Sequence, residues 1–194
     1  MNYLAHCFLS CANEDVLLGN FMTDFLRKDE IDNYTGDVQE GIQLHRVIDN
    51  YTDEHPASLE LRAMLRPRHG KYAPVVVDLI WDYYLSVNWK DYAGSSLEDF
   101  AHTIYDILLN RRLELPSKLN MRLDEMIAND FLRSYSSKVR MLSSLRWMDR
   151  RAKFNSNFES AVLDVEENEE KIQELFTSFF PEMIRHVEQS CSCL

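Results

Sequence analysis

Apolar side chains recur at intervals of three and four residues along most of the chain, which places them on one face of an α-helix. The chain has only 5 glycines in 194 residues, so it supplies few of the turns that join short strands. This pattern predicts an all-α fold. Helices are expected at about residues 2–11, 15–25, 39–54, 57–65, 75–89, 97–113, 119–126, 131–147 and 158–180, and from 182 through 186 and beyond.

Prolines mark several of the predicted helix ends. Pro56 is expected to stop the helix at 39–54, because the residue before a proline avoids the helical region. Pro67 and Gly70 indicate a turn, and Pro74 suits the first position of the helix that follows. The charged stretch 27–37 is expected to be a loop. Since no internal repeat or linker-like stretch divides the sequence, residues 1–194 are interpreted as a single domain.

Composition narrows the class of protein. Hydrophobic residues make up 45% of the chain and charged residues 27%, which excludes a disordered protein. Acids interrupt the apolar runs well before the roughly 20 residues of a membrane span, and the start of the chain lacks the basic flank of a signal peptide. We therefore expect a cytoplasmic protein without membrane contact. The formal net charge of -11 argues against nucleic acid as a partner.

Two acids interrupt the most apolar predicted helix. Residues 75–85 are apolar or aromatic apart from Asp78 and Asp82, and a helix of this kind is normally buried. The four-residue spacing places both carboxylates on one face, where they repel each other and lose hydration. Something positively charged is therefore expected to face them.

Other predicted helices show the same feature. His45, Asp49 and Asp53 follow each other at four-residue steps, Asp24 interrupts the apolar positions of the second helix, and His6 interrupts those of the first. Taken together, these segments predict a shared metal site. The residues that could contribute to it are His6, Asp24, His45, Asp49, Asp53, Asp78 and Asp82. Taken singly, each has another interpretation: a core histidine with a hydrogen-bond partner, a surface His45–Asp49 pair, or an acid paired with a nearby arginine.

Imidazole and carboxylate ligands suit manganese, iron, zinc or magnesium, and the absence of thiolates near them argues against a structural zinc site. A shared divalent ion would offset the repulsion between the acids and lower the pKa of a bound water, which is the chemistry of hydrolysis. The sequence lacks the motifs of nucleotide-binding loops, zincins and α/β-hydrolases. Without a C-x-x-C pair, all four cysteines are expected to be reduced thiols: Cys7, Cys11, Cys191 and Cys193.

The acidic chain contains one basic stretch, at residues 138–153, with Asp149 as its single acid. Its basic residues are Lys138, Arg140, Arg146, Arg150, Arg151 and Lys153. Arginine suits phosphate through its planar fork of donors, and Arg46 beside His45 would add a donor near the metal. The alternative is a solvated helix face whose charges pair with acids elsewhere. The acidic run 163–174 is expected to be an exposed helix face.

Several segments resemble the acyl carrier protein phosphodiesterases. They are Asn2-Tyr3-Leu4-Ala5-His6, Gly19-Asn20 with Asp24-Phe25, Gly41-Ile42 with His45-Arg46, Ile48-Asp49 with Thr52-Asp53, and Asp78 with Trp81-Asp82, followed by the thinner matches Arg150-Arg151 and Phe180-Pro181 with Met183. The resemblance implies a helical fold related to the HD-type metal-dependent phosphohydrolases. It also implies a divalent metal, commonly Mn²⁺, with Mg²⁺ or Fe²⁺ as alternatives. The ligands that the resemblance implies are Asp24, His45, Asp49, Asp78 and Asp82, with His6 as a further one.

The activity that this resemblance implies is hydrolysis of the phosphodiester joining 4′-phosphopantetheine to a serine of holo-acyl carrier protein, an acidic partner. Asp24, His45 and Asp53 would then be catalytic, and Arg46, Arg150 and Arg151 would bind the substrate. Two other functions stay open: a phosphohydrolase acting on a nucleotide or other small phosphodiester, and a non-catalytic helical protein that binds phosphopantetheine.

Overall fold

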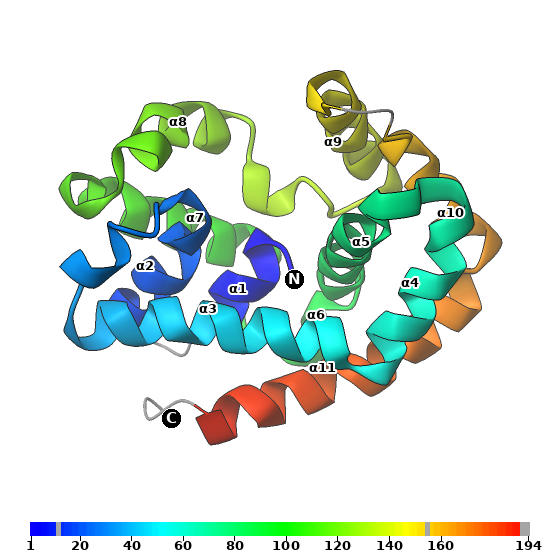
Figure 1. Cartoon of the computed structure of the whole chain (residues 1–194), viewed down its shortest axis with the longest axis horizontal. Helices are drawn as coiled ribbons and strands as arrows, with labels where there is room; N and C mark the ends of the chain where they lie inside the picture. The colour runs from blue at the N-terminus through cyan, green and yellow to red at the C-terminus, as the bar shows by residue number, and fades with distance from the viewer. Residues whose placement is uncertain (11–12, 154–155, 191–194) are drawn as a thin grey trace.

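The computed structural model describes residues 1–10, 13–153 and 156–190, and every regular element in these ranges is a helix (Figure 1). The α-helices are α1 (Tyr3–Phe8), α2 (Glu14–Met22), α3 (Gly36–Glu54), α4 (Pro56–His69), α5 (Ala73–Val87), α6 (Trp89–Tyr92), α7 (Leu97–Asn110), α8 (Ser117–Ala128), α9 (Lys138–Arg151), α10 (Ala161–Glu167) and α11 (Glu169–Ser190). Short 3₁₀ helices are η1 (Thr23–Phe25), η2 (Ile31–Asn33), η3 (Gly70–Tyr72), η4 (Arg112–Glu114), η5 (Phe131–Arg133) and η6 (Phe158–Ser160). The all-α prediction is confirmed.

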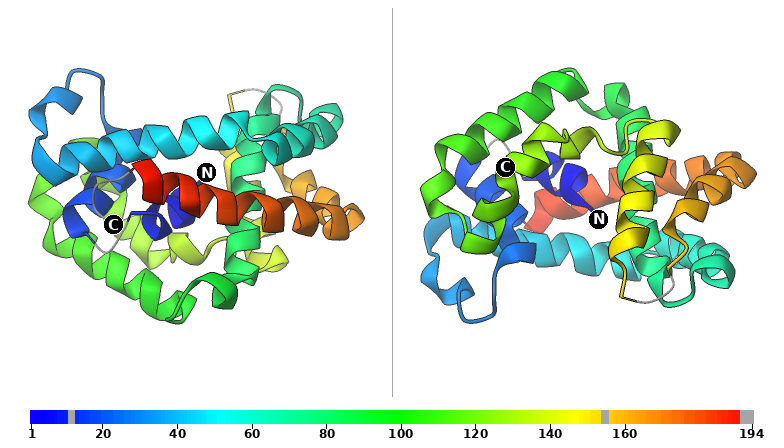
Figure 2. Two further views of the ribbon diagram at one scale, coloured as in Figure 1. Left: turned by 90° about the horizontal axis from the view of Figure 1, so that it is seen from below. Right: turned by 90° about the horizontal axis from the view of Figure 1, so that it is seen from above.

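The long helix α3 runs along one edge of the molecule, and α11 packs alongside it (Figures 1 and 2). Helices α2, α7 and α8 gather at one end of α3, whereas α4, α5, α9 and α10 gather at the other (Figure 1). The short helix α1 lies between these two groups, close to the middle of the molecule (Figure 1). None of the helices in the described part of the chain combines the length and apolar character that crossing a bilayer requires.

The apolar core consists of two clusters that meet at α1 and α3. Residues of α2, α7 and α8 form one cluster, to which α1 adds Cys7 and α3 adds Ile42. Residues of α4, α5 and α11 form the larger cluster, to which α1 adds Leu4 and α3 adds Ile48. Polar side chains on α1 and α3 therefore have a place at the boundary between two apolar regions, where they do not interrupt either one.

Helices α2 and α3 cross at two glycines, with almost no space between their backbones. A methyl group added to Gly19 would lie 2.0 Å from the carbonyl oxygen of Val38, and one added to Gly41 would lie 2.1 Å from that of Val16. Such distances are far inside van der Waals contact, so only glycine permits this crossing. The close approach brings the end of α2 beside the middle of α3.

Two proline positions have different outcomes. As predicted, α3 ends before Pro56, and the Nδ1 atom of His55 accepts a hydrogen bond from the backbone N–H of Ala57 at the start of α4. The predicted turn at Pro67 is wrong, because α4 continues through this residue to His69 and ends at Gly70, which has a φ of 54°. Pro67 removes one backbone donor from the last turn, but buried side chains on both sides of it, Leu65 and His69, hold the helix in place.

Two of the long predicted helices are wrong in their extent. The segment expected at 131–147 begins as η5, and α9 starts only after Ser137, whose side chain accepts a hydrogen bond from the N–H of Arg140. The segment expected at 158–180 breaks at Asn168, whose side-chain amide donates to the carbonyl of Asp164. Beyond that break, α11 continues through Pro181, since buried side chains on both sides hold the helix in place.

The loop expected at 27–37 contains the single short turn η2, and α3 already begins at Gly36. Cys7 is buried and reduced, as predicted. The other three cysteines, at positions 11, 191 and 193, lie outside the described residues.

Candidate functional site

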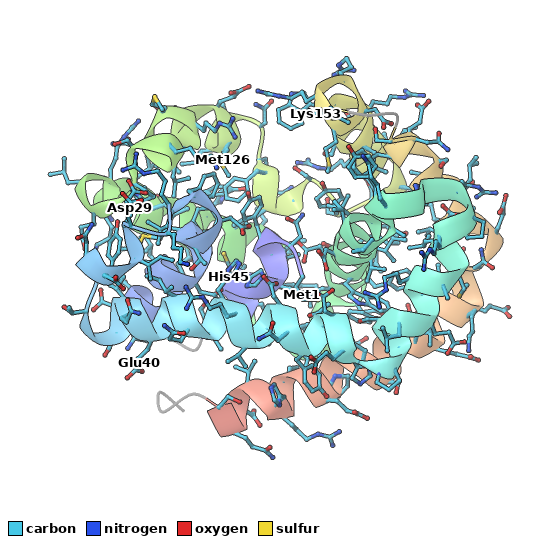
Figure 3. The ribbon with its side chains drawn as sticks, in the orientation of Figure 1. Met1, Asp29, Glu40, His45, Met126 and Lys153 are labelled. Atoms are coloured by element: carbon cyan, nitrogen blue, oxygen red, sulfur yellow. The ribbon has the colours of Figure 1, made fainter. Side chains whose placement is uncertain are left out.

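Two histidines from different helices stack at the boundary of the two apolar clusters. His6 lies on α1 and His45 on α3, and their ring centroids are 4.1 Å apart with an angle of 15° between the planes. Both residues are buried, with 3% and 5% of their surface exposed. His45 and Met1 lie near the centre of the molecule (Figure 3). Two buried imidazoles at this distance need well-defined hydrogen-bond partners.

The side chain of Asn20 on α2 orients the His6 ring. Its amide nitrogen donates to the carbonyl of His6 at 3.0 Å and to the hydroxyl of Ser10 at 2.9 Å. The amide oxygen therefore faces His6 Nδ1, at 2.8 Å, and accepts a hydrogen bond from its N–H. The backbone carbonyl of Asn20 accepts in the same way from His45 Nδ1, at 2.9 Å. In both rings the proton sits on Nδ1, so the Nε2 atoms are left for other partners.

Both Nε2 atoms point at carboxylates. His6 Nε2 lies 3.2 Å from Asp49 Oδ1, and His45 Nε2 lies 3.2 Å from Asp49 Oδ2 and 3.3 Å from Asp24 Oδ1. In neutral rings with a proton on Nδ1, these contacts set a nitrogen lone pair against carboxylate oxygens. The arrangement is stable only when something positively charged lies between them, either a proton or a metal ion.

The electrostatics of the site show how strongly positive charge is favoured there. Burial lowers the pKa of His45, but its hydrogen bonds to Asp24 and Asp49 outweigh burial and raise the pKa to about 9. Burial would raise the pKa of Asp49, yet hydrogen bonds from His45 and His6 hold it well below its usual range. For His6 burial is the stronger effect, and its pKa is lowered.

One ligand atom from each of His6, His45 and Asp49 lies within 4.8 Å of the other two, a spacing that suits a single bound ion. Histidine ligands typically donate their second ring N–H to a carbonyl or carboxylate, as both rings do here toward Asn20. Asp24 adds a carboxylate at the open side of this group, with 59% of its side chain exposed. The donor set therefore fits a divalent cation that accepts imidazole and carboxylate ligands.

Asp78 and Asp82 have different surroundings, although the sequence places them on one face of α5. Asp78 is half-buried, and its Oδ1 lies 3.0 Å from the α-amino group of Met1, which is also 3.5 Å from Asp49 Oδ1. Asp82 is buried, and its two oxygens accept hydrogen bonds from the backbone N–H groups of Leu4 at 3.0 Å and Ala5 at 3.2 Å. The expected positive partners are thus an ammonium group and the N-terminus of α1.

Asn2, at the N-cap position of α1, makes no capping hydrogen bond with its side chain. Asp82 on α5 serves as the cap instead, since it accepts from the N–H groups of Leu4 and Ala5. Replacing Asp82 with alanine leaves two buried N–H groups without acceptors, and we expect a loss of about 2–4 kcal/mol in the free energy of unfolding. Urea denaturation measures this change. Asp91→Asn, at an exposed carboxylate on α6, is the control and should shift stability by less than about 0.5 kcal/mol.

The same variant distinguishes the two roles considered for Asp82. If Asp82 anchors α1, the Asp82→Ala protein is less stable than wild type even after a chelator has removed all metal. Unchanged stability of the metal-free Asp82→Ala protein, combined with weaker metal binding, would contradict the anchoring role and support the sequence-based prediction of a ligand.

The other predicted site residues on α3 lie outside this network. Arg46 is exposed, and its guanidinium donates to the side-chain oxygen of Gln43 at 3.2 Å. Asp53 is also exposed, one turn beyond Asp49, and its charge acts on Asp78. Neither makes a hydrogen bond or ion pair with the His6, His45 and Asp49 group in the described part of the chain, so their predicted roles in substrate binding and catalysis remain predictions.

The basic stretch along α9 is partly neutralised. Lys138 pairs with Glu169 at 3.3 Å, Arg140 with Asp130 at 2.8 Å, and Arg146 with Glu159 at 3.0 Å. For these three residues the interpretation as a solvated face paired with acids is correct. Arg150 and Arg151 are exposed, and the guanidinium of Arg151 lies 4.4 Å from the ring centroid of Trp147. Neither of these two arginines pairs with an acid among the described residues.

Sequence reasoning assigned no role to Asn20, although this residue fixes both imidazole rings. A signal was present, since Asn20 is a fully polar side chain in the apolar stretch of α2 and is completely buried. A buried amide has to satisfy its donors and acceptor within the protein. The partners of Asn20 come from α1 and α3, and spacing within one helix does not reveal them.

Comparison with known proteins gives a consistent result. A family model described as acyl carrier protein phosphodiesterase matches residues 1–183. A protein of that name from Photorhabdus laumondii is 31% identical over 97% of this chain and 96% of its own length. Similar proteins of the same name from Yersinia enterocolitica and Serratia proteamaculans are 28% and 29% identical, over 97% of this chain and 98% of theirs. No solved structure matches, so the expected relation to HD-type phosphohydrolases remains a prediction.

Proposed function

The chain belongs to the acyl carrier protein phosphodiesterase family, and from this premise we propose that it hydrolyses the phosphodiester between 4′-phosphopantetheine and a serine of holo-acyl carrier protein. We further propose that the reaction depends on a divalent metal ion, with Mn²⁺ as the first candidate. The observation that carries the metal proposal is the orientation of the His6 and His45 rings, which turns two Nε2 lone pairs toward the carboxylate of Asp49.

His6, His45 and Asp49 would hold the ion, with Asp24 as a further ligand at the exposed side. A divalent ion in this position supplies Lewis-acid stabilisation of charge on the phosphoryl oxygens and lowers the pKa of water near it. Asn20 keeps both Nδ1 protons in place, so that the rings neither rotate nor change tautomer. If His45 uses Nε2 for the ion, the same atom is not available to protonate the departing serine oxygen.

Asp24 is suited to receive a proton from the attacking water. Its carboxylate is the most exposed of those in contact with the histidines, with 59% of the side chain exposed against 43% for Asp49, so water and substrate can reach it. Placement on η1, directly after α2, puts this carboxylate at the edge of the site where a bulky protein substrate can approach.

The proposal is tested by mass spectrometry of holo-acyl carrier protein incubated with the purified protein. Loss of the 4′-phosphopantetheine mass is expected with Mn²⁺ present, and no loss after treatment with a chelator. Readdition of Mn²⁺ should restore the reaction. Turnover of a nucleotide panel without conversion of holo-acyl carrier protein would contradict the substrate, and conversion by metal-free protein would contradict the metal.

Arg150 and Arg151 are proposed to help dock the acidic carrier protein. Both are exposed at the end of α9, next to the exposed Trp147. Replacing both with alanine should raise KM for holo-acyl carrier protein about three- to tenfold with little change in kcat, because exposed charges mainly affect association. Steady-state kinetics at low and high salt measure the effect, which should shrink as salt is added.

Arg185→Ala is the control for this double variant, since Arg185 belongs to the C-terminal part of α11, and that end of the helix lies at the opposite edge of the molecule from α9 (Figure 1). Equal KM values for wild type and the Arg150→Ala, Arg151→Ala protein would contradict a role of these two arginines in docking.

A further inference from the structure

Helix α8 presents two basic residues beside the exposed carboxylate of the site. The ammonium group of Lys118 lies 5.7 Å from the ring centroid of Phe25, the residue that directly follows Asp24. Arg122 lies four residues further along α8, and therefore on the same face of the helix as Lys118. Both side chains are exposed, whereas Leu119 and Leu123 between and beside them anchor α8 in the apolar cluster.

Tyr3 connects this face of α8 to the histidine cluster. Its ring stacks on Phe25 at 6.0 Å between centroids, and the residue lies on α1, three positions before His6. Burial raises the pKa of the Tyr3 hydroxyl, the negative charge of Asp24 raises it further, and the positive charge of Arg122 acts in the opposite direction. Phe25 therefore contacts Tyr3 on one side and Lys118 of α8 on the other, which places this face of α8 beside the residue that follows Asp24.

Arg122 differs from the other arginines of this region in having no acid as a partner. Arg111 forms an ion pair with Asp15 at 2.6 Å, and Arg112 forms one with Asp124 at 2.8 Å. No acid in the described part of the chain forms an ion pair with Arg122. In a chain with a net charge of -11, an unpaired guanidinium on the face of α8 that carries Lys118 is well placed to bind an external anion.

We propose that Arg122, assisted by Lys118, forms an anion-binding subsite for the phosphate group of the substrate, at the Asp24 side of the site. The inference rests on the proposed function, because a phosphodiester has to approach Asp24, Asp49 and Asp78, which all repel it. A guanidinium can offset that repulsion and bind two phosphate oxygens at once. In this structure the guanidinium of Arg46 donates to the side chain of Gln43.

The kinetic test replaces Arg122 with glutamine, which keeps much of the side-chain length and removes the charge. We expect KM for holo-acyl carrier protein to rise about tenfold, equivalent to the loss of about 1.4 kcal/mol, with kcat within threefold of wild type. The KM of Arg122→Lys should lie between those of wild type and Arg122→Gln, because lysine keeps the charge but lacks the bidentate fork. Lys118→Gln should show a smaller rise in KM. The melting temperature should stay the same for all three, since the side chains are exposed.

A binding measurement separates this subsite from the proposed reaction. Calorimetric titration with free 4′-phosphopantetheine should give a Kd about tenfold weaker for Arg122→Gln than for wild type, and inorganic phosphate should compete. Arg185→Gln on α11 serves as the charge-matched control with unchanged KM and Kd. If wild type leaves holo-acyl carrier protein intact but binds phosphopantetheine through Arg122, the proposed function fails and the subsite stands. Unchanged KM and Kd in Arg122→Gln would overturn the subsite, whatever the activity of wild type.

Discussion

Replacing Asp49 with asparagine should lower kcat/KM for holo-acyl carrier protein by more than about a hundredfold, since even indirect partners of a metal ligand contribute 10- to 100-fold. Among the residues that the structure describes, Asp49 is the one carboxylate that contacts both histidines, with one oxygen directed to each ring. The substitution keeps the size of the side chain but removes its charge and turns one of the two acceptors into a donor. The site then has a weaker ligand and an N–H group facing an Nε2 atom.

Two measurements check this prediction. Steady-state kinetics give the loss of activity, and metal analysis of the purified protein gives the loss of bound ion. We expect activity and metal content to fall together in Asp49→Asn. A high concentration of added Mn²⁺ should restore part of the activity. Asp106→Asn, at an exposed carboxylate on α7, should match wild type in both measurements. Wild-type activity and metal content in Asp49→Asn would remove Asp49 from the site and leave the histidine pair without its proposed role.

Replacing Gly41 with alanine should destabilise the protein by about 3 kcal/mol or more, at the upper end of what overpacking costs. The added methyl group would lie 2.1 Å from the carbonyl oxygen of Val16 and 2.8 Å from the backbone nitrogen of Asn20. These are backbone atoms, which cannot rotate away as a flexible side chain does. Helices α2 and α3 would have to separate, and the distance from the Asn20 carbonyl to His45 would increase.

Urea denaturation of Gly41→Ala and of a matched variant, Gly94→Ala, measures this effect. Nothing lies within 4 Å of a methyl group added to Gly94, so that substitution should change stability by no more than about 0.5 kcal/mol. Gly41→Ala should also bind Mn²⁺ more weakly at temperatures where it is still folded, because Asn20 no longer orients the His45 ring. Equal stability of the two variants would contradict the close crossing of α2 and α3.

The sequence predicted most helices because their apolar spacing agrees with what they bury. α3 and α5 lie within three residues of their expected positions, since both have strong periodicity and a proline close to one end. The errors occur where local chemistry opposes a continuous pattern. Ser137 and Asn168 stop or start helices through their own side chains. Pro67 and Pro181 do not stop theirs, because tertiary packing outweighs the loss of one hydrogen bond.

For the candidate site, four-residue spacing correctly grouped His45 with Asp49, which lie on one face of α3 and interact there. The same reasoning grouped Asp78 with Asp82, yet one faces an ammonium group and the other caps α1. Spacing fixes the face of a helix on which a side chain lies, and it contains no information about what that face meets. Arg122 was overlooked for the same reason, since its importance depends on η1 lying next to α8.

The sequence by itself determined an all-helical chain with acids and imidazoles on otherwise apolar helix faces, because periodicity and burial are local properties of each segment. Only the tertiary structure decided which of these side chains meet. The glycine crossing of α2 and α3 brings Asn20 to His45, and the Asp82 cap holds α1 so that His6 stacks on the same ring. Distances between helices depend on contacts among residues far apart in the chain, and no single helix encodes them.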